Sequence, residues 1–338
     1  MEWNRQKLIY DLIVLAGILL YLVLFVGLSA YFHPPATKGT LLLRGLATCA
    51  FLLLSLTLAI GPMVRIWPSL VPLLYNRRHL GVATFFVALA HGSIVTIHFH
   101  GSGDLNPLVS LLSSNTRIDS VAHFPFELLG VLALLILLVL AVTSHDFWLF
   151  SLTPPVWKAL HMCVYFAYAL VMGHVLLGAL QAERNPALLV LFATGVGTVL
   201  TLHLISGFRE SRLDRNADTE NQMVDVCGVD EIAESRARIV CVSGERVAVF
   251  RYNGMVSAIS NVCRHQNGPL GEGKIIDGCV TCPWHGYQYR PESGASPTPY
   301  TDKVSTYRTQ VVEGRVQLDP RALPPGTFVE PARIEHEG

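Results

Sequence analysis

The sequence predicts a multidomain protein in which a six-helix all-α transmembrane bundle is followed by a small all-β domain. Three observations support this fold class. The 338 residues have a mean hydropathy of +0.43, which is typical of membrane proteins. The first two thirds of the chain hold six long apolar runs. The last third alternates short strand-like runs with turns, and it also holds two pairs of Cys and His.

The six apolar runs are each long enough to cross a bilayer, which takes roughly 20 helical residues. They lie at residues 8–31, 41–60, 80–99, 126–143, 156–180 and 187–208. The first run is longer than the apolar core of a signal peptide, which has about 7 to 15 residues, so we interpret it as a membrane span. The sequence therefore predicts a transmembrane domain over residues 1–208.

The orientation of the spans follows from the Lys and Arg residues near their ends. Nine basic residues lie on one side of the membrane: Arg5, Lys7, Arg65, Arg77, Arg78, Lys158, Arg209, Arg212 and Arg215. Four lie on the other side: Lys38, Arg44, Arg117 and Arg184. Because basic residues are enriched on the cytoplasmic side, we expect a multi-pass cell (inner) membrane protein, surrounded by lipid, with both termini in the cytoplasm.

The polar segment 209–221 is predicted to be a linker between the two domains, or the end of a helix that runs out of the membrane. Strand-like runs follow it at residues 238–242, 246–252, 256–260, 304–312 and 315–318. Turn pairs separate them as in β-hairpins: Ser243-Gly244, Asn253-Gly254 and Glu313-Gly314. We expect a small all-β domain over residues 222–320 and a C-terminal tail over residues 321–338.

The charge distribution differs between the two parts of the chain. Residues 1–215 hold 13 Lys and Arg against 9 Asp and Glu, whereas residues 216–338 hold 12 against 16. No basic run indicates nucleic-acid binding, and the acidic surface of the second part favours a partner redox protein. The seven Cys residues do not form the framework of an extracellular disulfide-rich protein.

Two Cys and His pairs organise the segment 261–290. Cys263-x-His265 is followed after sixteen residues by Cys282-x-x-His285. This is the ligand set of a Rieske [2Fe–2S] centre, in which two thiolates hold one iron and two imidazoles hold the other. The predicted chemistry is one-electron transfer, with no catalytic side chain.

A structural zinc site is the alternative interpretation, because Cys263, His265, Cys279 and Cys282 would also supply four nitrogen and sulfur ligands. That reading leaves His285 without a role. Residues 222–320 resemble a Rieske-type ferredoxin domain through the CRH and CPWHG segments. The resemblance implies a [2Fe–2S] cluster as cofactor.

The ligand loops also distinguish between kinds of Rieske centre. Rieske proteins of cytochrome bc complexes carry an extra Cys in each loop, forming a disulfide, and a Ser hydroxyl bonded to the cluster. This chain has neither, since Tyr287 stands in the place of the Ser, although Tyr289 retains the expected Tyr. Hydrogen bonds to cluster sulfurs raise the potential, so this centre resembles the low-potential ferredoxin and oxygenase type.

Ten of the thirteen His residues precede residue 215. Ionisable residues within a membrane are candidate functional groups because burying them is costly. His161 and His174 differ by roughly 140° around a helix and by roughly 20 Å along it, so they cannot ligate one iron together. Their depths suit two haems, or one haem and another site. His91, in the third span, could complete bis-His coordination with a facing helix. A lone membrane His can instead bond a backbone carbonyl.

Residues 40–208 resemble the ferric reductase-like transmembrane family, which includes the haem-binding membrane subunit of the periplasmic methionine sulfoxide reductase system. The matching segments are RRHLGVATFFVALAH (77–91), Thr143-Ser144 and WKALHMCVYFAYALVMGH (157–174). The resemblance implies b-type haem, one or two per chain, at His91, His161 and His174. It favours His91 and His174 as a pair towards the outer side.

Other His residues leave alternatives open. His203 or His79 could partner His161 at a site nearer the cytoplasm. His98, His100 and His123 lie near the outer face, and we expect solvated loop residues there rather than second ligands or a quinone or metal site.

The expected function is that of an oxidoreductase component. The wider family continues into flavin and nicotinamide domains, but a GxGxxG fingerprint is absent here, and the Rieske domain takes that place. We expect a cytoplasmic reductase or ferredoxin to reduce the cluster, and electrons to pass through haem b to quinone or a periplasmic acceptor. One alternative is the reverse flow, from quinol through haem and cluster to a cytoplasmic oxygenase. Another is a non-catalytic redox-sensing or assembly subunit.

Overall fold

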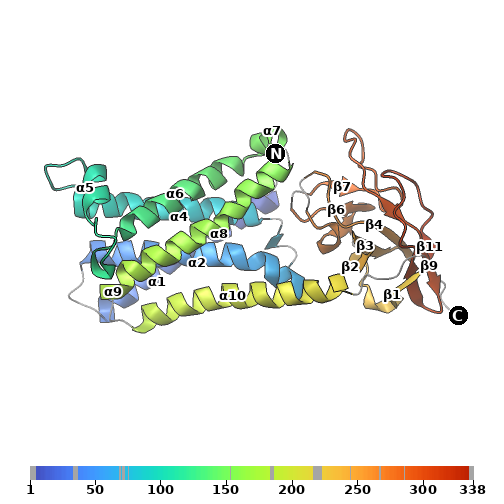
Figure 1. Ribbon diagram of the computed structural model, residues 1–338, viewed down its shortest axis with the longest axis horizontal. Helices are drawn as coiled ribbons and strands as arrows, with labels where there is room; N and C mark the ends of the chain where they lie inside the picture. Colours follow the sequence, from blue (N-terminus) through green and yellow to red (C-terminus); the bar gives the residue numbers. More distant parts are fainter. Residues whose placement is uncertain are drawn as a thin grey trace. The chain divides into compact units, whose positions relative to one another are not determined.

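The computed structural model describes residues 5–32, 37–67, 70, 73–74, 76–152, 154–182, 186–215, 223–243, 245–265, 268–284 and 286–334 (Figure 1). The chain divides into two compact units. The first comprises residues 1–60 and 76–201, and the second comprises residues 61–75 and 202–338.

Within the described part of the chain, six helices are long and apolar enough to span a membrane. They are α1 (Arg5–Phe32), α2 (Lys38–Ile66), α4 (Arg77–His100), α6 (Phe126–Thr143), α8 (Pro154–Leu177) and α10 (Pro186–Arg215). The shorter helices are α5 (Pro107–Ser113), α7 (Asp146–Ser151) and α9 (Ala179–Ala182). These helices confirm the predicted six-helix transmembrane domain.

The membrane helices pack through large apolar side chains. Helix α6 packs against α8, and α4 packs against α6. A buried cluster joins Phe51 of α2, Phe85 of α4, Leu137 of α6 and Tyr168 of α8. The Tyr168 hydroxyl lies 3.1 Å from the Ser55 hydroxyl, which satisfies both polar groups inside the bundle. Apolar side chains that point away from the core give these helices the outer surface that lipid requires.

Polar contacts attach α1 to its neighbours. The Tyr21 hydroxyl donates to Thr48 Oγ1 of α2 at 2.8 Å. His79 Nδ1 of α4 lies 2.8 Å from the Asp11 carboxylate of α1. A Cβ on Gly45 would lie 3.1 Å from the Phe25 ring, so the absence of a side chain there lets α1 and α2 approach closely.

The C-terminal part is built from antiparallel strands. They are β1 (Val224–Gly228), β2 (Arg236–Val242), β3 (Glu245–Tyr252), β4 (Met255–Ser260), β5 (Lys274–Ile276), β6 (Cys279–Thr281), β7 (Gln288–Tyr289), β8 (Thr306–Tyr307), β9 (Thr309–Val312), β10 (Arg315–Leu318) and β11 (Ala332–Arg333). The sheet orders are β1-β10-β9, β11-β4-β3-β2 with β8 beside β4, and β5-β6-β7. The all-β prediction is confirmed.

The predicted hairpins have the expected turns. Asn253 and Gly254 have φ angles of 48° and 71°, as a type I′ turn between β3 and β4 requires. Glu313 and Gly314, between β9 and β10, have φ angles of 50° and 70°. Ser243 has a φ of 50°, and its partner Gly244 lies outside the described residues.

Two boundaries differ from the sequence prediction. Ala332 of β11 pairs with Val256 of β4, so the sheet includes residues beyond 320, where we predicted a tail. A two-residue strand is too short to show an alternating pattern. Helix α10 continues past the predicted domain end at 208 to Arg215, as the helix-end interpretation of segment 209–221 expects, and residues 216–221 lie outside the described residues.

Two apolar clusters fill the β-domain. The first gathers Val229 with Val247 and Val249 of β3 and with Leu318 of β10, so it joins side chains of two different sheets. The second contains Phe250, Leu270 and Val280, together with Cys263 and Cys282. The predicted metal-binding cysteines are therefore part of a packed core, which fixes their positions.

Candidate functional site

Each predicted ligand loop is a short turn closed by its own backbone hydrogen bonds. The Cys263 amide donates to the Gly268 carbonyl at 2.9 Å, and the Cys282 amide donates to the Tyr287 carbonyl at 2.8 Å. Both cysteines are only 1% exposed, and both thiols are free of disulfide bonds. The sequence thus places two buried thiols at the bases of two turns.

Gly268 brings the two loops together. A Cβ at this position would lie 2.7 Å from Cys282 Sγ and 3.2 Å from the Trp284 ring, so a larger residue would displace the thiol. The backbone of the first loop therefore passes directly against the thiol of the second. This close approach is what a cluster held jointly by both loops needs.

Tyr289 supports the first thiol. Its hydroxyl accepts a hydrogen bond from the Arg264 amide at 3.0 Å and lies 3.5 Å from Cys263 Sγ. Burial, and then the charge of Cys263, raises the pKa of Tyr289, so the phenol stays protonated and can donate to the sulfur. The Tyr predicted to be retained from other Rieske centres contacts the predicted ligand.

His265 lies against an aromatic side chain. Its imidazole stacks on the Tyr287 ring, with centroids 4.8 Å apart and 8° between the planes. The Tyr287 hydroxyl donates to the Asp302 carboxylate. Burial, and then that carboxylate, raises the pKa of Tyr287. Asp302 could not be predicted as a site residue, because nothing in the sequence pairs it with a Tyr fifteen residues earlier.

The zinc alternative finds no support among the described residues. It needs Cys263, His265, Cys279 and Cys282 around one ion, and all four are described, yet no group of three or more Cys, His, Asp or Glu among the described residues could hold one metal ion. A Rieske cluster has a different requirement, because it separates the thiolate pair and the imidazole pair onto two irons. The paired buried thiols and the nearby imidazole fit that donor set. His285 lies outside the described residues.

His91 and His174 share one arrangement in the membrane domain. His91 Nδ1 lies 3.2 Å from the Leu43 carbonyl, and His174 Nδ1 lies 2.8 Å from the Phe126 carbonyl. A carbonyl only accepts, so Nδ1 carries the proton and Nε2 keeps a lone pair for a metal. This tautomer leaves Nε2 of both side chains able to bind a haem iron, and the carbonyl contact is also the one that a structural membrane His makes.

A glycine makes room for His174. A Cβ on Gly130 of α6 would lie 2.8 Å from His174 Nδ1 and 2.9 Å from its Cε1. The imidazole therefore packs directly on the backbone of α6, which fixes the direction of Nε2. The sequence analysis did not identify this glycine, because its role depends on the packing of α6 on α8.

His161 has different surroundings. Its Nδ1 lies 3.0 Å from the Trp157 carbonyl, one turn earlier in α8, and its Nε2 lies 3.5 Å from the Ser144 hydroxyl. The imidazole stacks on the Trp157 indole at 3.8 Å, and that indole donates to the Thr143 carbonyl at 3.2 Å. Two of the three segments that carried the family resemblance, Thr143-Ser144 and 157–174, thus meet at His161. Both imidazole nitrogens of His161 have a polar neighbour, whereas the contacts of His91 and His174 involve Nδ1.

The remaining membrane His residues are dispersed. His79 contacts Asp11, and His100 Nδ1 lies 2.9 Å from the Ser110 hydroxyl. His98 meets Phe99 edge to face, and His123 is exposed in a short 3₁₀ turn. The contact with Asp11 engages one nitrogen of His79, as the carbonyl contacts do for His91 and His174.

The family comparisons agree with both predicted resemblances. Residues 222–308 match the Rieske [2Fe–2S] domain, and residues 44–172 match the ferric reductase like transmembrane component. The anthranilate 1,2-dioxygenase ferredoxin subunit of Burkholderia cepacia is 32% identical over 92 residues, which are 27% of this chain and 85% of that protein. The 3-phenylpropionate/cinnamic acid dioxygenase ferredoxin subunit of Photorhabdus laumondii is 33% identical over 95 residues, 28% of this chain and 90% of that protein.

A third relative is named as a heme-binding protein. The protein-methionine-sulfoxide reductase heme-binding subunit MsrQ of Brucella melitensis is 29% identical over 170 residues, 50% of this chain and 69% of that protein. Six apolar helices and a Rieske domain in one chain make an integral membrane electron-transfer protein. The chain belongs to the Rieske [2Fe–2S] family through residues 222–308, and this domain follows a ferric reductase-like transmembrane domain.

Proposed function

We propose that this protein passes single electrons from a cytoplasmic donor to a Rieske [2Fe–2S] cluster, then to b-type haem, and finally to quinone or a periplasmic acceptor. One observation carries the proposal. A single chain contains both parts of the route. One part has two turns with buried thiols that form no disulfide, and the other is a membrane domain in which His91 and His174 both keep Nε2 available. Neither half alone connects a soluble donor with the membrane.

Four residues would hold the cluster: Cys263, His265, Cys282 and His285. The cluster supplies one-electron exchange when bound. The protein part excludes water from the thiols, directs the Tyr289 hydroxyl at Cys263 and holds the His265 ring against Tyr287. These contacts keep the ligand geometry constant between redox states, as electron transfer requires.

The haem assignment rests on the membrane histidines. MsrQ is named as heme-binding, and His91 and His174 would hold a haem through Nε2. His161 marks a second site nearer the cytoplasm, either for a second haem or for a group that relays electrons from the cluster. The haem supplies a one-electron store within the bilayer when bound.

The cluster surroundings support the proposed direction of flow. None of the seven cysteines forms a disulfide, so no disulfide shields the cluster, and the Tyr287 hydroxyl donates to Asp302. Fewer hydrogen bonds to the sulfurs lower the potential, which favours donation from the cluster to haem. The acidic C-terminal part offers a docking surface for a basic cytoplasmic donor.

The reverse flow has one observation in its favour. Two relatives of the C-terminal domain are ferredoxin subunits of dioxygenases. A chain that moves electrons from quinol through haem to the cluster could serve a cytoplasmic oxygenase in the same way. A redox-sensing or assembly subunit, in contrast, would hold both cofactors without turnover between donor and acceptor.

Sidedness has its own experiment. A fluorescent reporter that matures only in the cytoplasm, fused after Gly338, should be active, because the basic residues near the helix ends place both termini there. A periplasm-specific phosphatase fused at the same position should be inactive. An active phosphatase would put the cluster outside the cytoplasm and exclude a cytoplasmic donor.

The electron route can be tested by stopped-flow spectroscopy on the purified protein. After a ferredoxin reductase and NADH are added, the haem bands should appear at a rate limited by cluster reduction. His265→Ala should abolish this reduction, whereas dithionite should still reduce the haem. Unchanged haem reduction by the reductase in His265→Ala would remove the cluster from the route.

A further inference from the structure

Helix α5 exposes an apolar face at the end of the bundle where α4 ends and α6 begins (Figure 1). Leu108, Val109 and Leu112 of α5, and Leu105 just before the helix, are each between 53% and 61% exposed. At about 100° per residue, the three side chains on α5 fall within one sector of the helix that is about 100° wide. These four residues are called the α5 patch below.

Hydrogen bonds hold α5 level with the ends of its two neighbouring spans. The Ser110 hydroxyl lies 2.9 Å from Nδ1 of His100, the last residue of α4. Beyond α5, the Asn115 amide nitrogen donates to Oε1 of Glu127, in the first turn of α6, at 2.6 Å. The Ser114 hydroxyl donates to the same oxygen at 3.3 Å. The depth of α5 in the membrane is therefore set by where α4 and α6 end.

The lengths of the two spans place those ends at the membrane surface. Helix α6 has 18 residues and is about 27 Å long, close to the roughly 30 Å thickness of the hydrocarbon core. Its first turn therefore lies at the boundary between acyl chains and head groups. Helix α4 has 24 residues and is about 36 Å long, so its last turn extends past this boundary. Helix α5, bonded to both ends, lies in the interface rather than in bulk water.

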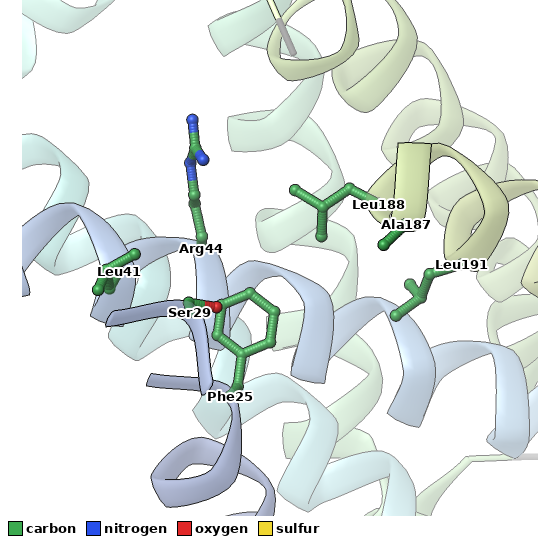
Figure 2. Close-up of a pocket in the computed structure, with 7 residues that line it drawn as sticks. All are labelled: Phe25, Ser29, Leu41, Arg44, Ala187, Leu188 and Leu191. Atoms are coloured by element: carbon green, nitrogen blue, oxygen red, sulfur yellow. The ribbon is translucent and has the colours of Figure 1, made fainter. Parts of the chain in front are cut away.

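The chemistry of the patch favours lipid acyl chains as its occupant. Residues 105–116 contain no Lys, Arg, Asp or Glu. A cavity of about 170 Å³ among α1, α2 and α10 has a different lining, since it holds the Arg44 guanidinium beside Phe25 and Leu188 (Figure 2). The α5 patch has no such cation that could select one head group. It therefore fits the acyl boundary of the bilayer as a whole.

We propose that α5 lies along the lipid interface, with the α5 patch in contact with acyl chains. Ile97 and Phe99, in the last turn of α4, are also exposed apolar side chains, so the patch continues the lipid-facing surface of the bundle at this level. Amphipathic helices in the interface bury their apolar face about 5–10 Å into the boundary. The lipid contact requires neither cluster nor haem, so it is independent of the proposed electron route.

The lipid contact also bears on His174. Glu127, which holds the end of α5, directly follows Phe126, whose carbonyl lies 2.8 Å from His174 Nδ1. Anchoring α5 in the interface thus holds the turn of α6 that contacts this predicted haem ligand.

Site-specific photo-cross-linking tests the occupant of the patch. The photoreactive amino acid p-benzoylphenylalanine replaces Leu108 or Leu112 in the full-length protein, which is illuminated in native membranes and analysed by intact-protein mass spectrometry. Both positions should gain the mass of one phospholipid. Leu135, an exposed residue in the middle of α6, is the positive control for lipid contact. Ser102, exposed in the loop after α4, should give at least fivefold less lipid adduct.

Other occupants of the patch would give different products. Adducts at Leu108 and Leu112 with a second copy of the chain, or with another protein, would overturn the proposal. Lipid adducts at Leu135 alone would overturn it as well, since they would show that the reaction works and that lipid does not reach α5. Equal yields of lipid adduct at Leu108 and Ser102 would have the same consequence.

Matched variants test the anchoring in lipid nanodiscs. Leu112→Asp should move α5 out of the interface, so the amides of residues 115–128 should exchange hydrogen at least fivefold faster than in the wild type. Ser113→Asp, at an exposed polar residue of the same helix, and Leu112→Phe, which keeps the face apolar, should both exchange at the wild-type rate. Amides of α2 report on the bundle. If Leu112→Asp disturbs them too, Leu112→Ala removes the contact without adding a charge. Exchange as slow as in Ser113→Asp would overturn the anchoring.

Discussion

The phenol ring of Tyr287 lies parallel to the imidazole of His265, with centroids 4.8 Å apart and 8° between the planes. The hydroxyl of the same Tyr donates to Asp302. The ring of Tyr287 thus packs against the predicted cluster ligand His265, while its hydroxyl donates a hydrogen bond to the Asp302 carboxylate. This arrangement gives a structural reason for the low cluster potential expected from the missing Ser.

The first prediction separates the ring of Tyr287 from its hydroxyl. Tyr287→Phe keeps the stack on His265, so the cluster potential should stay near that of the wild type. Tyr287→Ser removes the stack and supplies a short hydroxyl, and it should raise the potential on the order of 60 mV, a tenfold change for a one-electron couple. A potentiometric titration followed by electron paramagnetic resonance measures both. An unchanged or lowered potential in Tyr287→Ser would show that burial or net charge sets the value.

The second prediction concerns the metal ligands. His265→Ala and His285→Ala should abolish the Rieske electron paramagnetic resonance signal and leave haem absorbance intact, because the two cofactors belong to separate compact units. Cys279→Ser is the matched control. Cys279 is a ligand only in the zinc interpretation, so this variant should keep the signal. Zinc in place of iron, in protein made with intact iron–sulfur assembly, would refute the cluster assignment.

The sequence was sufficient to predict the ligand loops, because the spacing of Cys and His is itself the chemical requirement. It could not predict the Tyr287 and Asp302 pair. Asp302 lies on an irregular segment between β7 and β8, and its approach to Tyr287 depends on how that segment folds back. The same limit applies to β11, which is too short to carry a pattern.

The third prediction tests the packing of His174. Gly130→Ala would place a Cβ 2.8 Å from His174 Nδ1, so the imidazole must shift and the haem content should fall. Gly197→Ala is the matched control, since a Cβ there meets nothing within 4 Å. The haem-to-protein ratio from pyridine haemochrome spectra measures the effect. Equal ratios in the two variants would exclude His174 as an axial ligand held by this contact.

The positions of the membrane histidines could be predicted, but their hydrogen-bond partners could not. His91 and His174 each bond a carbonyl 48 residues earlier in the chain. Helical periodicity locates a side chain around its own helix, whereas these contacts depend on which helices become neighbours. The sequence also left His161 open, and the contacts with Trp157 and Ser144 appear only in the folded bundle.

The fourth prediction concerns stability at alkaline pH. Tyr307 is 1% exposed, and its hydroxyl donates to Glu245 at 2.8 Å. Burial, and then the Glu245 carboxylate, raises the pKa of Tyr307 above the ordinary value of 10.0. The folded state therefore favours the neutral phenol. Its contribution to stability is complete below pH 10 and is lost as the pH rises through the higher pKa of the folded state.

Tyr307→Phe tests this contribution. At neutral pH it should lower the free energy of unfolding of the β-domain by about 1 kcal/mol, the usual value of one hydrogen bond. Above pH 10 the variant should lose stability less steeply than the wild type, since it has no phenol to ionise. Urea unfolding followed by visible circular dichroism of the cluster measures both. A parallel loss of stability in the two proteins would contradict the assignment.

The direction of electron flow is tested most directly by one potentiometric titration of the purified protein. Haem bands are followed optically, and the cluster is followed by electron paramagnetic resonance in the same sample. We predict a cluster midpoint at or below that of the haem, so that transfer from cluster to haem is downhill or neutral. A cluster midpoint more than about 100 mV above every haem would contradict this direction, because each 59 mV is a factor of ten for a one-electron couple. That result would support flow from quinol to the cluster instead.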